Sequence, residues 1–195
     1  EWKGFRAGKP EKKMGIRGSH TTSLFFENVE VPRANVLGGV GEGFKVAMQT
    51  LDVARVSLAA QCLGASKEML DLSIKHANER VQFDKPIAEQ QAVQFMLADM
   101  AADIYQVESI LYRTAWMVDQ GLPFGRESAI CKLAATDAVC RVADRAVQIH
   151  GGMGYMREYP IERLYRDARV NRIFEGTNEI QHLVIAKTLT KKGTY

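Results

Sequence analysis

A single carboxylate near the C-terminal end of the chain has the setting of a general base. Glu175 follows the apolar pair Ile173-Phe174 and precedes Gly176, at the start of a predicted helix. A carboxylate among apolar side chains is well suited to abstract a proton, and an adjacent glycine permits an unusual backbone and the close approach of a ligand. An acid at a helix N-terminus is equally expected from the helix dipole alone. The residues by themselves leave both interpretations open.

Two further segments could contact a phosphate or a flat cofactor. Residues 148–154 form a glycine-rich run after a predicted helix, and the run is neither a dinucleotide fingerprint nor a Walker loop. It could be a simple helix end, or its backbone could lie against a ligand. Arg80 and Phe83 flank a loop, where the arginine could compensate a helix dipole or bind a pyrophosphate beside an aromatic ring.

An acid and an arginine on the first predicted helix also have two interpretations. Asp52 and Arg55 are three residues apart. That spacing is typical of a surface ion pair, which contributes little to stability. The alternative is a forked arginine that reaches an adenine or a phosphate.

Composition excludes several classes of protein. The 195 residues carry 26 Lys and Arg against 23 Asp and Glu, and 46% of them are hydrophobic. This apolar content is too high for intrinsic disorder, and no apolar run approaches the roughly 20 residues that span a bilayer. The basic residues are too scattered for a nucleic-acid groove. The four histidines have no metal-ligand spacing, so no metal site is expected, and Cys62, Cys131 and Cys140 are interpreted as buried thiols.

Apolar residues at spacings of three and four predict a mainly α-helical fold. The helices are expected over residues 43–80, 89–120, 127–149, 160–168 and 178–189. Long helices with short connections fit an antiparallel four-helix up-and-down bundle. Trp116 and the methionines at helical spacing are expected in its core.

Residues 1–40 have a different character. Thr22 to Val31 is rich in β-branched and aromatic residues, which predicts two short strands joined near Glu27-Asn28 and ending at Pro32. So few strands cannot bury a face alone, and the chain begins at Glu1 without a methionine. We therefore expect residues 1–40 to be the end of a truncated β-domain and residues 41–195 to form a helical domain.

The order of these motifs resembles the acyl-CoA dehydrogenase family. The resemblance extends over essentially the whole chain and matches the C-terminal half of such an enzyme, namely the end of its middle β-domain and its C-terminal helical bundle. Six stretches carry it in this order: residues 27–32, 43–48, 79–86, 148–155, 165–169 and 174–181.

The resemblance implies a flavin-dependent activity. Family members use FAD to convert an acyl-CoA thioester, here of short or medium chain length, to the trans-2-enoyl-CoA. Glu175 matches the base that removes the α-proton while the β-hydrogen passes as hydride to flavin N5. The position that supplies the base in other members is Ala54 here, which cannot serve. The backbone N–H of Glu175 would stabilise the charge that develops on the thioester oxygen.

The resemblance also assigns binding residues. The positions matched to FAD are Arg80, Phe83, Gln91, Gln148, Ile149, His150, Gly151, Gly152, Thr177, Asn178 and Glu179, and those matched to acyl-CoA are Asp52, Arg55, Phe174 and Gly176. Arg80, Gln91 and residues 148–152 match positions that contact the FAD of a neighbouring subunit, which implies a homodimer or homotetramer. Asp84 replaces a glycine common in the family, and His150 and Met153 vary within the glycine-rich run.

Partners and alternatives follow from the same resemblance. The expected electron acceptor is an electron-transfer flavoprotein, in the cytoplasm of a bacterium or the mitochondrial matrix of a eukaryote. One alternative is an acyl-CoA oxidase that passes electrons to O₂. The other is a non-catalytic helical module used for assembly.

Overall fold

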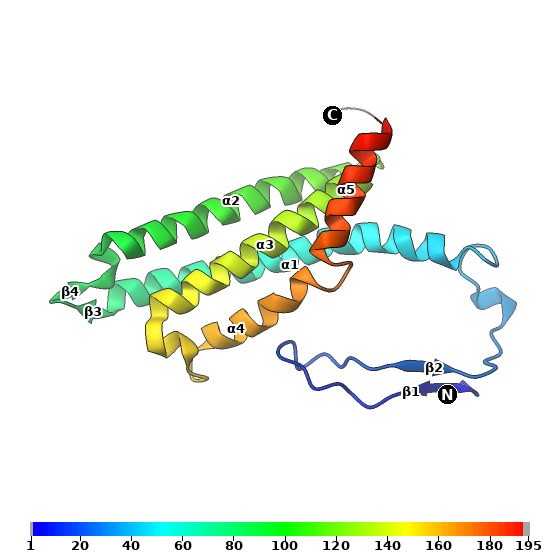
Figure 1. Ribbon diagram of the computed structural model, residues 1–195, viewed down its shortest axis with the longest axis horizontal. Helices are drawn as coiled ribbons and strands as arrows, with labels where there is room; N and C mark the ends of the chain where they lie inside the picture. Colours follow the sequence, from blue (N-terminus) through cyan, green and yellow to red (C-terminus); the bar gives the residue numbers. More distant parts are fainter. Residues whose placement is uncertain (1, 193–195) are drawn as a thin grey trace.

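Five helices make up most of residues 2–192. The computed structural model describes residues 2–192 (Figure 1). The three long helices, α1 (Gly43–Glu79), α2 (Gln91–Asp119) and α3 (Gly125–His150), run side by side in alternating directions along the chain. The shorter helices α4 (Pro160–Ala168) and α5 (Asn178–Lys192) both pack against α3. The predicted helical bundle is confirmed, and α3 is its centre because it contacts every other helix.

Short 3₁₀ turns make the connections between the helices. They are η1 (Arg33–Asn35), η2 (Ile87–Glu89), η3 (Gly151–Tyr155) and η4 (Arg169–Arg172). Within residues 2–192 no helix combines the length and the apolar character required to cross a bilayer.

Small residues on α3 bring the long helices close together. Ala135, Ala138, Val142 and Ala146 are all buried along one face of α3. Small side chains let two helix backbones approach closely, so the contact relies on shape rather than on large apolar groups.

Trp116 does not lie in this core, although periodicity placed it there. Its side chain is 56% exposed, whereas Leu111 and Thr114 of the same helix are buried. Two residues of helix turn a side chain by roughly 200°, so Trp116 faces away from the side that Thr114 occupies. For the methionines the prediction holds at Met69 and Met100, which are fully buried, but it is wrong for Met48, near the start of α1, which is 37% exposed.

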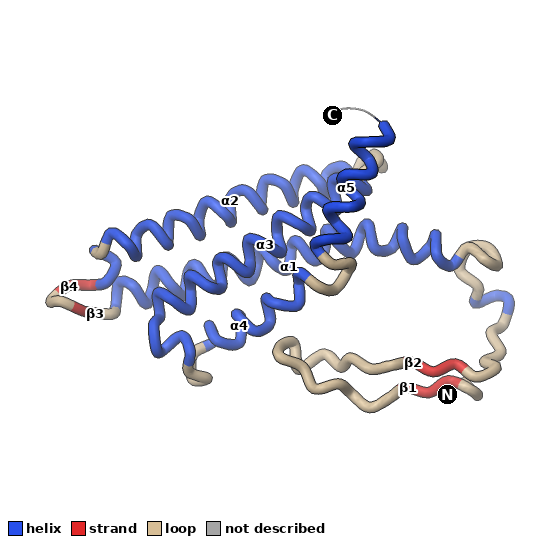
Figure 2. The backbone as a smooth tube through the Cα atoms, in the orientation of Figure 1, coloured by secondary structure: helices blue, strands red, loops and turns tan. Residues whose placement is uncertain are grey.

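The N-terminal segment forms an arm beside the bundle rather than part of it (Figure 2). Strands β1 (Phe5–Ala7) and β2 (Leu24–Phe26) pair antiparallel, with Phe5 opposite Phe26. The prediction of β2 is correct, but the second strand expected after Glu27-Asn28 is wrong. Asn28 has a left-handed backbone (φ 48°), so the chain turns away there, and β2 pairs with residues that lie much earlier in the sequence.

The arm touches the bundle at α4. Asp167 accepts a hydrogen bond of 2.5 Å from the backbone N–H of Ile16, and the Arg166 guanidinium donates to the carbonyl of Met14 at 2.8 Å. A side chain on Gly15 would lie 2.5 Å from the Arg166 carbonyl oxygen, so this approach requires glycine.

An ion-pair network joins α2 to α3. Asp103 is 9% exposed; Arg141 contacts its two oxygens at 2.5 and 3.2 Å, and Arg145 contacts it at 3.0 Å. Arg145 also pairs with Asp99 at 3.1 Å, but the Asp99 side chain is 62% exposed. The two aspartates therefore share an arginine but differ in burial.

Asp103→Ala is expected to lower the free energy of unfolding by about 2 kcal/mol, because it leaves two arginines without their buried partner. The matched control Asp99→Ala removes only an exposed pair and should cost about 0.5 kcal/mol or less. Denaturant unfolding of both variants measures the difference. Equal losses would show that burial of Asp103 adds nothing.

The imidazoles of His76 and His150 stack where α1 and α3 end. Their ring centroids are 4.3 Å apart, and Nδ1 of His150 lies 2.8 Å from the Ala146 carbonyl oxygen. Burial lowers the pKa of both histidines from the ordinary value of 6.5, and for His76 the charge of His150 lowers it further. The folded protein therefore favours two neutral rings.

The folded-state pKa values of His76 and His150 lie below the unfolded value of 6.5. The stability that the two neutral rings contribute to the folded protein is therefore fully present above pH 6.5 and is lost as the pH falls below it. The Tm should therefore fall between about pH 7.5 and about pH 5.5, and His76→Gln should fall less steeply. His20→Gln, which alters an exposed loop histidine, serves as the control and should follow the wild type. Identical slopes for wild type and His76→Gln would contradict this assignment.

Candidate functional site

The backbone at Glu175 has an uncommon conformation. Glu175 (φ 59°) and Gly176 (φ 85°) are both left-handed, in the connection between η4 and α5. A left-handed residue other than glycine costs about 1–2 kcal/mol, and such strain persists only where the surroundings enforce it. A side chain at position 176 would lie 2.8 Å from the amide nitrogen of Gln181, so glycine is required there.

Two buried side chains hold this turn. Gln181, which has no solvent exposure, donates to the Gly176 carbonyl at 2.9 Å and contacts the Glu175 carbonyl at 3.4 Å. From α1, Nε of Arg55 donates to the same Glu175 carbonyl at 3.4 Å. The turn is therefore fixed through its carbonyl groups, which leaves the Glu175 side chain uninvolved in holding it.

One oxygen of the Glu175 carboxylate is buried and has no hydrogen-bond partner within residues 2–192. That oxygen is Oε2, and the Glu175 side chain as a whole is half-buried. Buried polar atoms are nearly always paired, so an unpaired carboxylate oxygen points to a role beyond structure. This feature fits the general-base interpretation better than that of an acid that merely complements a helix dipole.

Arg55 is not part of an ordinary surface pair. It is 6% exposed, and its Nη1 contacts Asp52 Oδ1 at 2.8 Å while Nε reaches the Glu175 turn. Of the residues assigned to acyl-CoA, the structure therefore brings Asp52, Arg55 and Gly176 together with Glu175. Phe174, which precedes Glu175, is 37% exposed.

The three residues matched to FAD at the start of α5 make different contacts. Thr177 caps the helix by accepting the Ile180 N–H at 3.4 Å. The Glu179 carboxylate accepts its own backbone N–H and the Thr177 hydroxyl, and these contacts lower its pKa. The Asn178 side chain is buried and bonded to α3. A phosphate role of Asn178 would therefore use its backbone rather than its amide.

A separate groove of about 620 Å³ lies where α1 and α3 end. It brings together five of the residues assigned to FAD and several that the sequence reasoning missed. The groove is lined by His76, Arg80, Gln82, Ile87, Ile149, His150, Gly151, Gly152, Met153 and Met156. His76 could have been found from its spacing, because residues four apart, such as His76 and Arg80, share a helix face.

The glycine-rich run gives this groove an open backbone wall. Gly151 has φ 59° and ψ −138°, a conformation that only glycine adopts readily, and its N–H caps α3 by donating to the Gln148 carbonyl. Nothing lies within 4 Å of where a side chain would stand at Gly151 or Gly152. The run is thus a helix end and also a surface that a flat ligand could approach.

The remaining assigned residues lie near the groove's end of the bundle but do not line it. Phe83 and Asp84 form a two-residue turn between β3 (Val81–Gln82) and β4 (Lys85–Pro86), both left-handed, with φ of 55° and 63°. Phe83 is 89% exposed at the tip of this hairpin. Gln91 is the exposed first residue of α2.

One protomer does not bring the groove and the Glu175 turn together. Arg55 and Arg80 are both on or next to α1, and 25 residues of helix span about 37 Å. Figure 1 shows η3 and the β3–β4 hairpin at one end of the bundle, while α5 starts toward the other. Within one copy of the chain, the two sets of residues therefore lie far apart.

Metal and thiol chemistry find no support in residues 2–192. No group of three His, Cys, Asp or Glu side chains in this range could hold a metal ion. Cys62 and Cys131 are buried as predicted, whereas Cys140 is only half-buried. Burial raises the pKa of all three thiols, to about 12 for Cys62 and about 11 for Cys131, so the thiols are inert.

Comparisons with known proteins agree on one family. The sequence model described as "Acyl-CoA dehydrogenase, C-terminal domain" matches residues 41–190. The chain is 49% identical to an acryloyl-CoA reductase (NADH) of Anaerotignum propionicum, with 97% of this chain and 48% of that protein covered. It is 47% identical to the short-chain specific acyl-CoA dehydrogenase of rat mitochondria, with 96% and 46% covered.

A solved structure gives the same result. Butyryl-CoA dehydrogenase from Megasphaera elsdenii superimposes with a TM-score of 0.94 at 44% identity, over 97% of this chain and 49% of that one. The chain thus spans about half the length of the relatives that it matches. Since the family model covers most of the chain and the helical fold agrees, this chain belongs to the acyl-CoA dehydrogenase family.

Proposed function

We propose that the protein containing this chain is an FAD-dependent acyl-CoA dehydrogenase, which converts a short-chain acyl-CoA to the trans-2-enoyl-CoA with Glu175 as the base. The observation that carries the proposal is the unpaired, buried Oε2 of Glu175 on a left-handed turn. Similarity to butyryl-CoA and short-chain specific dehydrogenases supports the short chain length.

The residues of this chain would act as follows. The Glu175 carboxylate takes the α-proton of the thioester, and the backbone N–H of Glu175 donates to the thioester oxygen as negative charge develops there. Arg55 and Gln181 keep the turn fixed through its carbonyls, so the base does not need to reorganise during the reaction. FAD, which Arg80 and the backbone of Gly151 and Gly152 would hold, would supply the acceptor for the β-hydrogen, which would leave as hydride.

The groove has the chemistry that the adenosine end of FAD requires. The Arg80 guanidinium can pair with a phosphate, and the open backbone of Gly151 and Gly152 can lie against a flat ring. Phosphate can also bind at the N-terminus of α5, beside the Thr177 hydroxyl. Since these regions lie at different ends of one bundle, FAD would lie between two copies, in a homodimer or homotetramer.

The wider setting of the reaction follows from the family. An electron-transfer flavoprotein is the proposed electron acceptor, in the cytoplasm of a bacterium or in the mitochondrial matrix of a eukaryote. Transfer to O₂ would make the protein an oxidase instead, and failure to bind FAD would favour an assembly module.

Glu175→Gln in the complete flavoenzyme should lower turnover at least about 100-fold, because general-base catalysis contributes that much or more. The flavin absorbance should remain, since the substitution preserves the shape of the side chain. Anaerobic bleaching of the flavin by butyryl-CoA measures the effect, and Glu158→Gln, an exposed acid outside the site, is the control. Full turnover of Glu175→Gln would refute the base assignment.

The same assay tests the chain length and the acceptor. Butyryl-CoA should bleach the wild-type flavin, whereas a long-chain acyl-CoA should not. Peroxide release in air at the rate of turnover would identify an oxidase.

Arg80→Gln should raise the Kd for FAD about ten- to a hundredfold, as expected for the loss of a charge-assisted hydrogen bond to phosphate. Arg113→Gln, which alters an exposed arginine of α2, should leave the Kd unchanged. Titration of apoprotein with FAD, followed by flavin fluorescence, gives both constants. An unchanged Kd for Arg80→Gln would exclude this arginine from the FAD site.

A further inference from the structure

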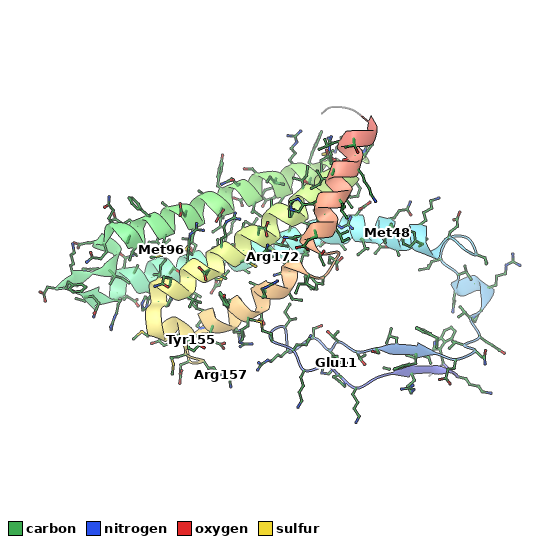
Figure 3. All side chains as sticks on the ribbon, viewed as in Figure 1. Glu11, Met48, Met96, Tyr155, Arg157 and Arg172 are labelled. Carbon is green, nitrogen blue, oxygen red and sulfur yellow. The ribbon has the colours of Figure 1, made fainter. Side chains whose placement is uncertain are left out.

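One carboxylate oxygen of α3 contacts both ends of the turn that carries Glu175. Oδ1 of Asp137 is 2.8 Å from Nε of Arg172, the last residue of η4. The same oxygen accepts a hydrogen bond of 2.9 Å from Nδ2 of Asn178, the first residue of α5. Figure 3 labels Arg172 where the chain passes from α4 toward α5 beside α3. Residues 173–177, called the Glu175 loop below, are therefore closed at their base by a single atom.

Two buried residues of α3 also form hydrogen bonds with the Asn178 side chain. Lys132 donates to its Oδ1 at 2.7 Å and Thr136 at 3.0 Å, and neither of these two residues has any solvent exposure. The oxygen of the amide thus faces Lys132 and Thr136, while its nitrogen faces Asp137. The three residues that bond to the Asn178 side chain all belong to α3, so the start of α5 has little freedom to shift.

Charge makes the contact with Asp137 specific. Lys132 and Arg172 carry two positive charges near the base of the Glu175 loop, and burial lowers the pKa of Lys132. Glu179 also faces both cations, but it is Asp137 that contacts Arg172, at 2.8 Å. The Asp137 carboxylate therefore offsets the two cations and also accepts from Asn178, which a neutral side chain could do only in part.

The Glu175 loop needs such closure because its backbone is strained. Arg55 and Gln181 hold the carbonyls of the two left-handed residues, but neither contact fixes the distance between residues 172 and 178. If the base of the loop opened, residues 175 and 176 could relax toward more common backbone angles. The carboxylate of Glu175 would then move from its position.

We propose that Asp137 is a positioning residue for the reaction: by joining Arg172 to Asn178 it keeps the Glu175 loop closed and the Glu175 carboxylate in place. Asp137 does not touch the substrate and acts only through these two neighbours. The inference rests on the proposed function, since it presupposes that Glu175 is the base. A purely structural role, like that of Asp103, is the competing explanation.

The test compares Asp137→Ala and Asp137→Asn with Asp103→Ala in the complete holoenzyme. The readouts are the rate of anaerobic flavin bleaching at saturating butyryl-CoA, expressed per bound flavin, together with KM and Tm. Asp137→Ala should slow bleaching about ten- to a hundredfold, because misplacing a catalytic group by about 1 Å costs that much. Its KM should change less than twofold. Asp137→Asn, which keeps the shape but loses the charge, should show a smaller loss.

Asp103→Ala supplies the structural control, because it lowers Tm at a site on the α2–α3 interface away from the loop. It should bleach at the wild-type rate per bound flavin. If Asp137→Ala or Asp137→Asn also bleached at the wild-type rate, while Tm fell as in Asp103→Ala, the positioning role would be wrong. Should Asp137→Ala fail to retain flavin, Asp137→Asn decides in the same way.

A double-mutant cycle tests whether Asp137 acts through Arg172. If Asp137 acts through Arg172, then Asp137→Ala combined with Arg172→Ala should bleach no more slowly than the slower single variant. Losses that multiply would overturn this route. Failure of the proposed function is distinguishable, because it would appear as full turnover in Glu175→Gln, whereas failure of the inference leaves Glu175→Gln inactive and Asp137→Ala active.

Discussion

The candidate site depends on the hydrogen bond that the buried ammonium group of Lys132 donates to Asn178. Lys132 has no solvent exposure, and a buried charge without a partner is very costly. The Asn178 side-chain oxygen, 2.7 Å away, meets this need. Because Asn178 is the first residue of α5, the position at which α5 begins is determined by a charge on α3. The chain that arrives from α4 must reach this point, and Glu175 lies on that short path.

Three helices then hold the segment around Glu175 from different sides. Arg55 reaches it from α1, Asp137 from α3 and Gln181 from within α5. All three contacts engage backbone atoms or flanking residues rather than the Glu175 carboxylate. The fold thus stabilises a strained backbone, and within residues 2–192 it leaves one oxygen of the Glu175 carboxylate without a hydrogen-bond partner, as the proposed general base requires. The backbone carbonyls of residues 175 and 176 thus hold the turn in place, and the proposed reactivity belongs to the Glu175 carboxylate.

Local patterns in the sequence predicted the helices and the special character of the Glu175 turn, because both arise from neighbouring residues. Periodicity located the long helices to within a few residues, and Gly176 after an acid indicated an unusual backbone. Features that depend on distant partners were not predictable in this way. β2 pairs with a strand 17 residues earlier, and the Asn178 amide turns inward to reach Lys132, 46 positions away. Trp116 was misplaced because apolar character alone does not define which face of a helix is buried.

The length of α1 has a consequence for the assembly that the proposed function requires. This helix contributes Arg55 to the Glu175 turn, and its C-terminal end leads into Arg80 in the groove, with about 37 Å of rigid helix between them. A continuous helix cannot fold back to bring the two regions together, and α1 packs along α3 for much of its length. A cofactor that needs both regions must therefore take them from different copies. The proposed homodimer or homotetramer would bring the two regions together, with one copy contributing the groove and another the Glu175 turn.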